Sequence, residues 1–327
     1  MDRPVLTLAT SDHDRTRAIV DGRVRIEGWE VASATLPPEE IFRRAFGEAA
    51  FDIAELSLSS YLVQRDRGGS PYIALPAFVS RAFRHDAVYV RRGWGVTRPE
   101  DLRGRRVGVP EYQVTATVWL RAMFETQHGV SPADVDWVTG GVDAPGRTEK
   151  IPLDLPPQIR VAGAQPGRTL SAMLHDGEIA ALICPRAPAA FDDGEGWIGR
   201  LYPDPRSASE DYFRQTGIFP IMHLVGLRAS LAEDHPDLAG AVFRAYCQAR
   251  DLAFTGLNDT TALSTLLPWQ IDELDRTRRI MGDDYWPYGL SRNRDALEAF
   301  VSAHSRQGLS RRPFAIDELF HPSTHAS

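Results

Sequence analysis

Two histidines draw attention because each lies in a polar segment between apolar, strand-like runs. His85 belongs to the segment 78–87, and His223 belongs to the segment 216–225. An imidazole titrates near neutral pH, so a histidine in a dry pocket can deliver or accept a proton. A histidine in an apolar setting is more often a satisfied core residue, but two histidines in equivalent places strengthen the functional interpretation. The pattern predicts acid–base chemistry where the two segments meet.

Four arginines are candidates for holding an anionic substrate. Arg81 and Arg84 lie in the first polar segment, Arg15 follows the first strand-like run, and Arg186 lies in the second half of the chain. The planar guanidinium group binds carboxylates through paired hydrogen bonds. Two such groups in one segment suit a substrate with more than one carboxylate, although a solvated basic face is the commoner explanation of clustered arginines.

Polar side chains also follow two other strand-like runs, at points where helices are expected to begin. They are Ser57, Ser59, Glu111, Tyr112 and Thr115. The first N–H groups of a helix face outward and bind anions, and hydroxyls at the same place serve as N-caps. The two roles can coexist, so these residues are candidates for substrate contact.

Apolar runs alternate with helical segments along the chain, which indicates a mainly parallel α/β architecture. The expected strands lie at 5–9, 53–56, 73–75, 88–90, 107–109, 135–138, 180–183 and 223–227. The segment 236–254 has apolar residues on one helical face and predicts a core-packing helix. In open α/β sheets ligands bind at the carboxyl ends of the strands, so the polar residues above are expected at that edge.

The two polar segments are expected to be passages between two lobes with a cleft between them. One lobe is then discontinuous, made of residues 1–84 and 221–327, and residues 85–220 form the other as a single insert. A long loop at 139–157 is rich in glycine and proline and carries Arg147, Glu149 and Lys150. Such loops are often lids, partner contacts or disordered segments.

Composition narrows the class of protein. The chain has 327 residues, 43% of them hydrophobic and 25% charged, with a net charge of −7. This is the balance of a soluble globular protein, and it argues against nucleic acid as a main partner. No window is apolar enough to span a bilayer and no signal peptide is apparent, so we expect a cytoplasmic protein without a membrane partner. Cys184 and Cys247 are interpreted as buried free thiols.

Cofactor motifs are not found in the sequence. It contains no P-loop, GxSxG elbow, HExxH or CxxC. We therefore expect no cofactor. A divalent metal held by His85, His223 and Glu111 is the alternative, but their spacing matches no metal motif.

The sequence resembles the 4,5-dihydroxyphthalate decarboxylase family over nearly the whole chain. The resemblance is carried by DRT at 14–16, GE at 47–48, FDIAELSLSSYL at 51–62, SRAFRH at 80–85, VGVPEYQVTA at 107–116, EK at 149–150 and GIFPIMH at 217–223. One departure is His13, where the family pattern has an aromatic residue, usually tyrosine. If this side chain touches the ligand, the ring substituents that are recognised differ.

The resemblance implies a type II periplasmic-binding-protein-like fold and the conversion of 4,5-dihydroxyphthalate to protocatechuate without oxidation. Each carboxylate of that substrate is para to a hydroxyl. Direct loss of CO₂ would leave a high-energy aryl anion, whereas protonation of the carboxylate-bearing carbon gives a dienone that loses CO₂ and regains aromaticity. No electron-sink cofactor is required for this route.

The site then needs an acid near the reacting carbon, an acceptor for the phenolic proton and a cation for the second carboxylate. We expect Arg81 and Arg84 to hold carboxylates and His85 to protonate carbon. Glu111 or His223 would take the phenolic proton, and the roles of the two histidines are interchangeable at this point. The ring would be oriented by Tyr112, Thr115, Ser57 and Ser59.

Two rival functions use the same fold, because fold does not fix function. One is a solute-binding protein that delivers a small aromatic acid to a transporter, and the other is a different enzyme, such as a cofactor-precursor synthase with an active-site histidine. A homo-oligomer is also considered: the Gly/Pro-rich loop and the segment 285–288 are candidates for contact with a second subunit. Trp286 packing beneath the cleft is the alternative for that segment.

Overall fold

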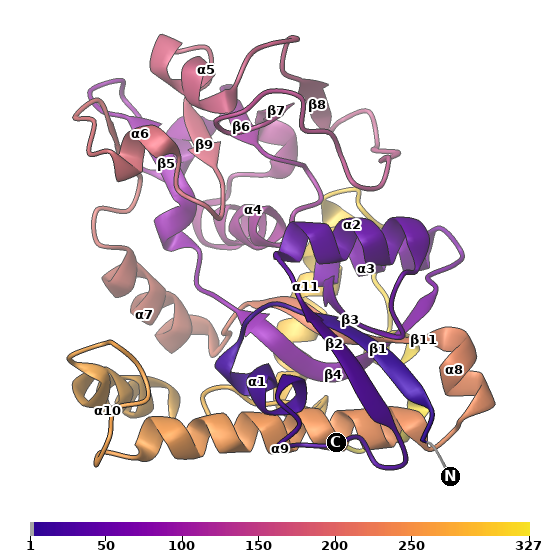
Figure 1. The fold of residues 1–327 in the computed structure, drawn as a ribbon. Helices are drawn as coiled ribbons and strands as arrows, with labels where there is room; N and C mark the ends of the chain where they lie inside the picture. The colour runs from indigo at the N-terminus through magenta and orange to yellow at the C-terminus, as the bar shows by residue number, and fades with distance from the viewer. Residues whose placement is uncertain (1–2) are drawn as a thin grey trace.

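The fold is built on two mixed β-sheets, as a computed structural model that describes residues 3–327 shows (Figure 1). The first sheet has the strand order β2-β1-β3-β11-β4, and the second has the order β10-β5-β9-β6-β7-β8. The strands of the first sheet are β1 (Val5–Thr10), β2 (Glu30–Thr35), β3 (Ile53–Ser57), β4 (Tyr72–Arg81) and β11 (Ile221–Arg228). Those of the second are β5 (Val88–Arg91), β6 (Arg106–Val109), β7 (Asp136–Thr139), β8 (Arg160–Gly163), β9 (Ala181–Ile183) and β10 (Ile198–Arg200).

Eleven α-helices flank the sheets in the described chain. They are α1 (Asp14–Val20), α2 (Pro38–Glu48), α3 (Leu58–Asp66), α4 (Thr115–His128), α5 (Leu170–Asp176), α6 (Ala189–Asp192), α7 (Pro205–Thr216), α8 (Ala229–Asp234), α9 (Leu238–Asn258), α10 (Gln270–Met281) and α11 (Arg294–Arg306). The helix expected at 236–254 is α9, and Leu238, Val242, Tyr246 and Ala249 are buried on one of its faces as expected. Short 3₁₀ turns connect several elements.

All eight expected strands are present, but three strands were not predicted. These are β2, β8 and β10, which lie at sheet edges or are only three residues long. β2 has mostly exposed side chains and the sequence EVASAT, so it contains no apolar run that would have revealed it. Pairing with β1 along six residues stabilises it instead.

The first sheet collects the expected functional positions at one edge. β1 runs parallel to β3, and β11 runs antiparallel to both β3 and β4. The start of β11 therefore lies beside the ends of its neighbours, with His223 opposite Ser57 on one side and Ser80 on the other. This is the edge at which ligands bind in open α/β sheets.

The chain crosses between the sheets twice, after β4 and before β11. The strands of the first sheet come from residues 5–81 and 221–228, and those of the second come from residues 88–200. The residue boundaries proposed for the two lobes stay a prediction.

Helix α4 joins the two halves of the molecule. One hydrophobic cluster runs through both sheets and includes Trp119 of α4 and Phe300 of α11. The Trp119 indole N–H donates to the Ile221 carbonyl at 2.8 Å. Arg121 of α4 is fully buried and donates to Gln307 Oε1 at 2.7 Å, beyond the end of α11. The side chains of α4 therefore bind it to both halves, and it is more than a cover for the second sheet.

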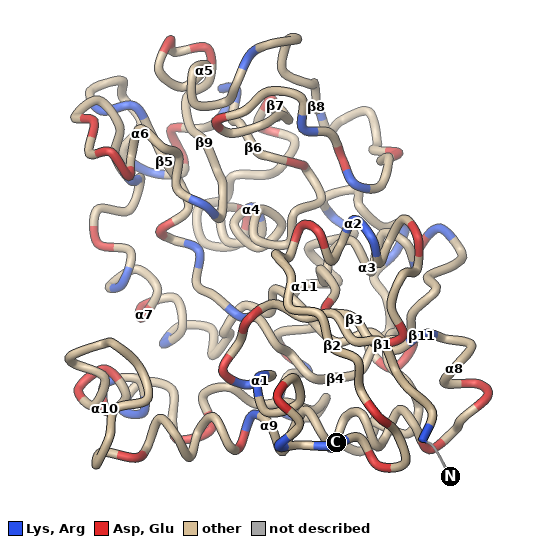
Figure 2. Tube along the Cα trace, viewed as in Figure 1, with Lys and Arg blue, Asp and Glu red and all other residues tan. Residues whose placement is uncertain are grey.

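Three further features are the distribution of charge, the character of the helices and the state of the two cysteines. Acidic and basic residues are interspersed over both halves (Figure 2). Within residues 3–327, no helix combines the length and apolar character needed to cross a membrane. Cys184 is buried and Cys247 is partly buried, both are unpaired, and burial raises the pKa of each thiol.

Candidate active site

Glu55 is the centre of the candidate site. It lies in β3 with 1% exposure and accepts four hydrogen bonds. Two come from the end of β1 and the residue after it, from the Thr10 hydroxyl at 3.3 Å and the Ser11 amide at 2.7 Å. The other two come from His13 Nε2 at 3.1 Å and His223 Nδ1 at 2.6 Å. Although burial alone raises the pKa of Glu55, the two histidines more than offset it and hold that pKa well below its ordinary value.

The partners of the two imidazoles define which nitrogen carries a proton. Glu55 as a carboxylate can only accept, so it receives N–H from His13 Nε2 and from His223 Nδ1. Arg15 can only donate, and its NH2 lies 2.9 Å from His13 Nδ1. Both ring nitrogens of His13 therefore have a partner within the protein. His223 is left with Nε2 for a substrate, and its side chain is 18% exposed.

Packing fixes the orientation of His223. Its ring meets the Phe42 ring of α2 edge to face, with 4.9 Å between centroids. β-sheet pairing places its backbone between Ser57 and Ser80. An imidazole held by a carboxylate on one nitrogen, with the other nitrogen unbonded, is the arrangement of a general acid or base.

Arg15 holds this group in place and does not bind as a free cation. Its Nε donates to the Val79 carbonyl at 2.5 Å, and its guanidinium lies 4.2 Å over the ring of Trp286. Asp14 pairs with it at 2.9 Å. Nε, NH1 and NH2 of Arg15 each have a partner within the protein. These contacts support a positioning role for Arg15, whereas substrate binding was predicted. Trp286 also donates to the Phe78 carbonyl at 2.8 Å, so it packs within the chain.

The two arginines of the first passage differ in their surroundings. Arg81 donates to the carbonyls of Phe219 and Pro287, each at 3.0 Å, and to Asn293 Oδ1. It ties the passage to the C-terminal segments, and burial lowers its pKa to about 9. Its Nε is buried without a hydrogen-bond partner, and the carboxylate contact predicted for Arg81 stays a prediction.

Arg84 is the arginine of this passage that is available to an anion. It is half-buried, its Nε is buried without a hydrogen-bond partner, and no ion pair joins it to another residue of the chain from 3 to 327. Burial lowers the pKa of Arg84, and nearby Asp86 offsets part of that effect. A desolvated, unpaired guanidinium is stabilised by binding a carboxylate.

His85 and His223 do not share partners. His85 Nδ1 lies 3.1 Å from the Ser209 hydroxyl, and its ring packs against Tyr202 and Tyr212. Burial lowers the pKa of His85 to about 4, so it is neutral at physiological pH. The predicted convergence of both histidines on one hollow is not seen in these contacts, and a catalytic role for His85 stays a prediction.

The hydroxyls predicted to orient a ring bind one another. Ser57 and Thr115 lie 3.0 Å apart through their hydroxyl oxygens, and the Ser59 amide donates to Thr115 at 3.1 Å. The Ser59 hydroxyl lies 3.1 Å from His304 Nε2. Tyr112 is fully buried and donates to a carbonyl near the end of α11. These residues dock the start of α4 onto α3, and any contact with substrate stays a prediction.

Glu111 anchors the long loop between β7 and β8, residues 140–159. Its Oε1 accepts from Lys150 Nζ at 2.6 Å and from Arg147 Nε at 2.8 Å, and its Oε2 accepts from the Lys150 amide. The same two cations reach Glu39 on α2, at 3.0 Å and 2.9 Å. Arg147 and Lys150 of the loop therefore bind both Glu111, after β6, and Glu39, on α2. Because two cations engage Oε1 and the Lys150 amide engages Oε2, Glu111 is a weaker candidate for the proton acceptor than predicted.

The remaining predicted residue, Arg186, is exposed after β9. Sequence reasoning missed Glu55 as a functional residue, although a signal was present. A carboxylate inside the apolar run 53–56 is costly to bury and usually requires partners. His13 was noticed as a departure but was not connected to His223, because 210 residues of sequence separate them.

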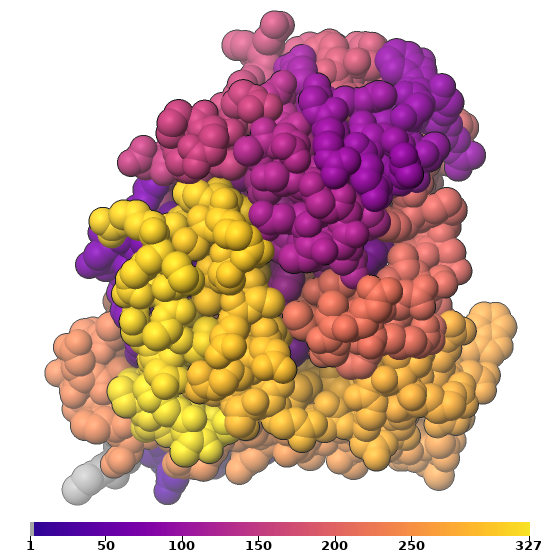
Figure 3. Space-filling model, turned by 180° about the vertical axis from the view of Figure 1, so that it is seen from behind, coloured from indigo at the N-terminus to yellow at the C-terminus, as the bar shows by residue number. Residues whose placement is uncertain are grey.

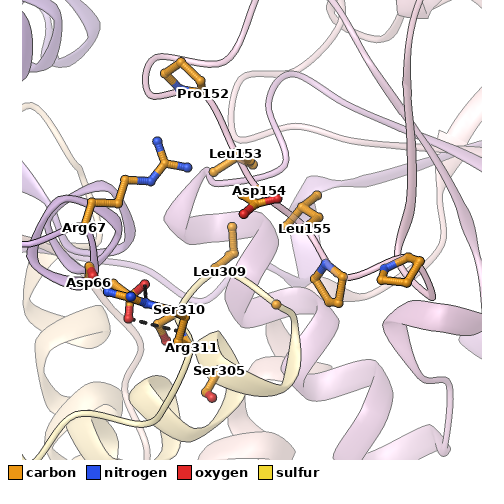
Figure 4. Close-up of a pocket in the computed structure, with 13 residues that line it drawn as sticks. Asp66, Arg67, Pro152, Leu153, Asp154, Leu155, Ser305, Leu309, Ser310 and Arg311 are labelled. Carbon is orange, nitrogen blue, oxygen red and sulfur yellow. Dashed lines mark hydrogen bonds and ion pairs between the residues drawn. The ribbon is translucent and has the colours of Figure 1, made fainter.

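The most voluminous of the described cavities, about 880 Å³, lies elsewhere (Figure 4). It is lined by Asp66, Arg67, residues 152–157, Ser305 and residues 308–311. Its charged residues include an ion pair between Arg311 and Asp66. None of the candidate acid–base groups lines it, so size does not identify the active site here. Within residues 3–327, no group of three or more His, Cys, Asp or Glu side chains is arranged to hold a metal ion.

Sequence comparison places the chain among characterised proteins. A family model described as NMT1/THI5 like matches residues 45–147. The 4,5-dihydroxyphthalate decarboxylase of Comamonas testosteroni is 46% identical over 324 residues, which is 99% of this chain and 98% of that protein. A 4,5-dihydroxyphthalate decarboxylase of Pseudomonas putida is 48% identical over 214 residues, 65% of this chain and 83% of that protein.

Solved structures confirm the two-lobed, periplasmic-binding-protein-like fold. The Escherichia coli aliphatic sulphonate binding protein SsuA matches with a TM-score of 0.51 at 12% identity, over 98% of this chain and 92% of that chain. The ligand-binding component of an ABC-type import system from Staphylococcus aureus matches with a TM-score of 0.53 at 14% identity, over 99% of both chains. At these identities the likeness establishes the fold alone.

The low pKa of His85 makes stability depend on pH. The unfolded chain binds a proton at His85 near pH 6.5, whereas the folded chain does so only near pH 4. Unfolding therefore becomes easier as the pH falls through that range. When the pH is lowered from 7 to 4, the free energy of unfolding of the parent should fall by about 3 kcal/mol more than that of His85→Gln. Urea denaturation at both pH values measures this, with the exposed His175→Gln as the control. Equal losses in the parent and His85→Gln would contradict it.

Proposed function

Because the chain belongs to the 4,5-dihydroxyphthalate decarboxylase family, we propose that it converts 4,5-dihydroxyphthalate to protocatechuate and CO₂, with His223 as the acid that protonates the ring. The observation that carries the assignment is the 2.6 Å contact between His223 Nδ1 and the buried Glu55, which leaves Nε2 without a partner. His13 and Arg15 complete the support behind Glu55.

The reaction begins with proton transfer from His223 Nε2 to the carbon that bears the leaving carboxylate. The para hydroxyl supplies electron density to the ring as that C–H bond forms. This hydroxyl becomes part of a protonated carbonyl, which is a strong acid, so water can accept its proton. Glu111 stays the second candidate for this step. The product of the step is a dienone with an uncharged carbonyl group, which still carries both carboxylates.

The dienone then breaks its C–CO₂ bond. The bonding electrons return to the ring and the carbonyl oxygen becomes a phenolate, which takes up a proton. One proton is consumed overall and CO₂ leaves as a neutral molecule. Glu55 contributes by fixing which nitrogen of His223 faces the ring and by placing a negative charge behind the imidazolium. Correct placement of a general acid typically contributes about 10²–10⁴-fold to the rate.

Arg84 is proposed to hold the carboxylate that stays on the ring. It is the unpaired, half-buried cation of the first passage, whereas NH1 and NH2 of Arg81 already donate to protein acceptors and only its Nε lacks a partner. Arg186, which is exposed, is the second candidate for this contact. The loop clasped by Glu39, Arg147 and Lys150 is proposed to cover the substrate. A dry site strengthens the contact between guanidinium and carboxylate.

Product analysis tests the proposed reaction. Purified protein is incubated with 4,5-dihydroxyphthalate, with and without EDTA, and products are followed by UV absorbance and chromatography. We expect protocatechuate in both samples without added cofactor. Tight binding without turnover would instead support the solute-binding function. Loss of activity on chelation, with recovery on adding a divalent metal, would overturn the prediction of a metal-independent reaction.

The acid assignment is tested by comparing three variants. We expect His223→Gln to lower kcat about 10²–10⁴-fold, because the proton donor is removed. Glu55→Gln is expected to lower kcat by at least tenfold, since the amide removes the negative charge behind His223 and its NH₂ group cannot accept from the Ser11 amide as the second carboxylate oxygen does. His85→Gln should keep kcat within about threefold, in line with its separate contacts.

Circular dichroism spectra and thermal unfolding of each variant separate loss of folding from loss of catalysis. If His85→Gln abolishes turnover while His223→Gln leaves it intact, the acid is His85 and our assignment is wrong.

Replacement of Arg84 tests the binding of the spectator carboxylate. Loss of one charge-assisted hydrogen bond costs about 1.5–3 kcal/mol, so Arg84→Gln should raise KM about 10–100-fold with a smaller effect on kcat. Arg186→Gln is the matched comparison, and we expect its KM to stay within about threefold of the parent. The opposite pattern in steady-state kinetics would move the carboxylate contact to Arg186.

A further inference from the structure

The largest concentration of exposed apolar side chains lies around the end of α9 and the start of α10. Of the eight exposed large hydrophobic residues in the described chain, six fall between residues 252 and 271. They are Leu252, Leu263, Leu266, Leu267, Trp269 and Ile271. Leu266 is fully exposed and Trp269 is 68% exposed. Such a concentration on a soluble protein typically marks an interaction surface.

This region projects from the body of the protein. α10 follows the far end of the long helix α9 (Figure 1). From behind, the light orange surface of this part of the chain protrudes at the lower right of the molecule (Figure 3). A partner could therefore reach α10 without contacting the candidate active site, which lies at the edge of the first sheet.

The exposed face of α10 has a charge pattern that complements itself. Asp272, Asp275, Arg276 and Arg279 are all exposed and follow one another at helical spacing. The acidic pair lies in the first half of the helix and the basic pair in the second half. Asp272, Asp275 and Arg279 form no ion pair within residues 3–327, and Arg276 pairs with Glu210 of α7. Three charges on this face are thus free to bind a partner.

Antiparallel alignment with an identical helix would pair every one of these charges. A two-fold axis passing between positions 275 and 276 brings Asp272 opposite Arg279 of the partner subunit, and Asp275 opposite Arg276 of the partner subunit. The same operation forms each contact twice. Antiparallel packing also sets the opposed helix dipoles favourably. We propose that a second copy of this chain docks on α10 in this antiparallel arrangement, giving a two-fold homodimer.

Other occupants fit this surface less well. A membrane surface is bound by apolar residues rimmed with lysine and arginine, because common cytoplasmic-face lipids are anionic. The α10 face instead carries equal numbers of acidic and basic side chains, in a protein with a net charge of −7. Apolar residues such as Trp269 and Leu266 beside the charged stripe supply area that an ion-pair stripe alone lacks.

Charge reversal tests both the surface and its symmetry. Sedimentation velocity from about 1 to 100 µM, a range suited to protein pairs of moderate affinity, measures self-association of the parent, Asp272→Arg and Arg279→Asp. We expect the parent to dimerise. Each single variant should weaken the dimer at least tenfold, since like charges then meet twice across the axis. Asp193→Arg, an exposed reversal far from α10 in the sequence, is the matched control and should associate like the parent.

Mixing the two variants provides the decisive measurement. In a 1:1 mixture of Asp272→Arg and Arg279→Asp, both cross-axis contacts of the mixed pair again join opposite charges, so heterodimers should form with near-parental affinity. Trp269→Glu should weaken association without being rescued by mixing. A monomeric parent, single variants that dimerise like the parent, or a mixture that fails to recover association would each overturn the proposal. Circular dichroism on every variant shows whether α10 is still folded.

Discussion

The sharing of one buried carboxylate by two imidazoles is the interaction on which the candidate site depends. Glu55 is almost completely removed from water, so its charge is tolerated only because four hydrogen bonds reach it. Those donors come from the end of β1 with the loop after it and from the start of β11, which are distant in the sequence. The carboxylate therefore holds the strand edge together and determines the direction in which His223 presents its free nitrogen. The same Glu55 contacts thus stabilise this edge of the sheet and orient the His223 ring.

A second constraint comes from α4. Its buried side chains bind the body of the second sheet to the C-terminal segments, through Trp119 to β11 and through Arg121 to Gln307. In a two-lobed binding protein the lobes commonly rotate about the crossing strands. Here a hydrophobic cluster extends continuously between the sheets, so the two halves share one interior. The framework around His223 is thus packed from both halves, which suits the precise placement of a proton donor.

The sequence predicted the fold better than the site, and the reason is physical. Apolar runs reveal buried strands, so all eight expected strands were found, whereas the polar edge strand β2 depends on pairing with β1 and leaves no periodic signal. His223 and Arg84 were marked by their place in the two passages, and their roles stay predictions. The partners of Arg81 could not be predicted, because two backbone carbonyls and the Asn293 side chain come together around it only in the folded chain. Glu55 and His13 were missed as partners for the same reason.

The clasp between the loop at 140–159 and α2 bears on how molecules enter and leave. Two cations are shared by a buried carboxylate, Glu111, and a largely exposed one, Glu39. The inner attachment is shielded from salt and persists, while the outer one is weakened by dissolved ions. The loop would then detach from Glu39 of α2 while it stays bound to Glu111, and this local movement would control the entry and exit of small anions. Such a movement would make the exchange of reactant and product sensitive to ionic strength without any rearrangement of the interior.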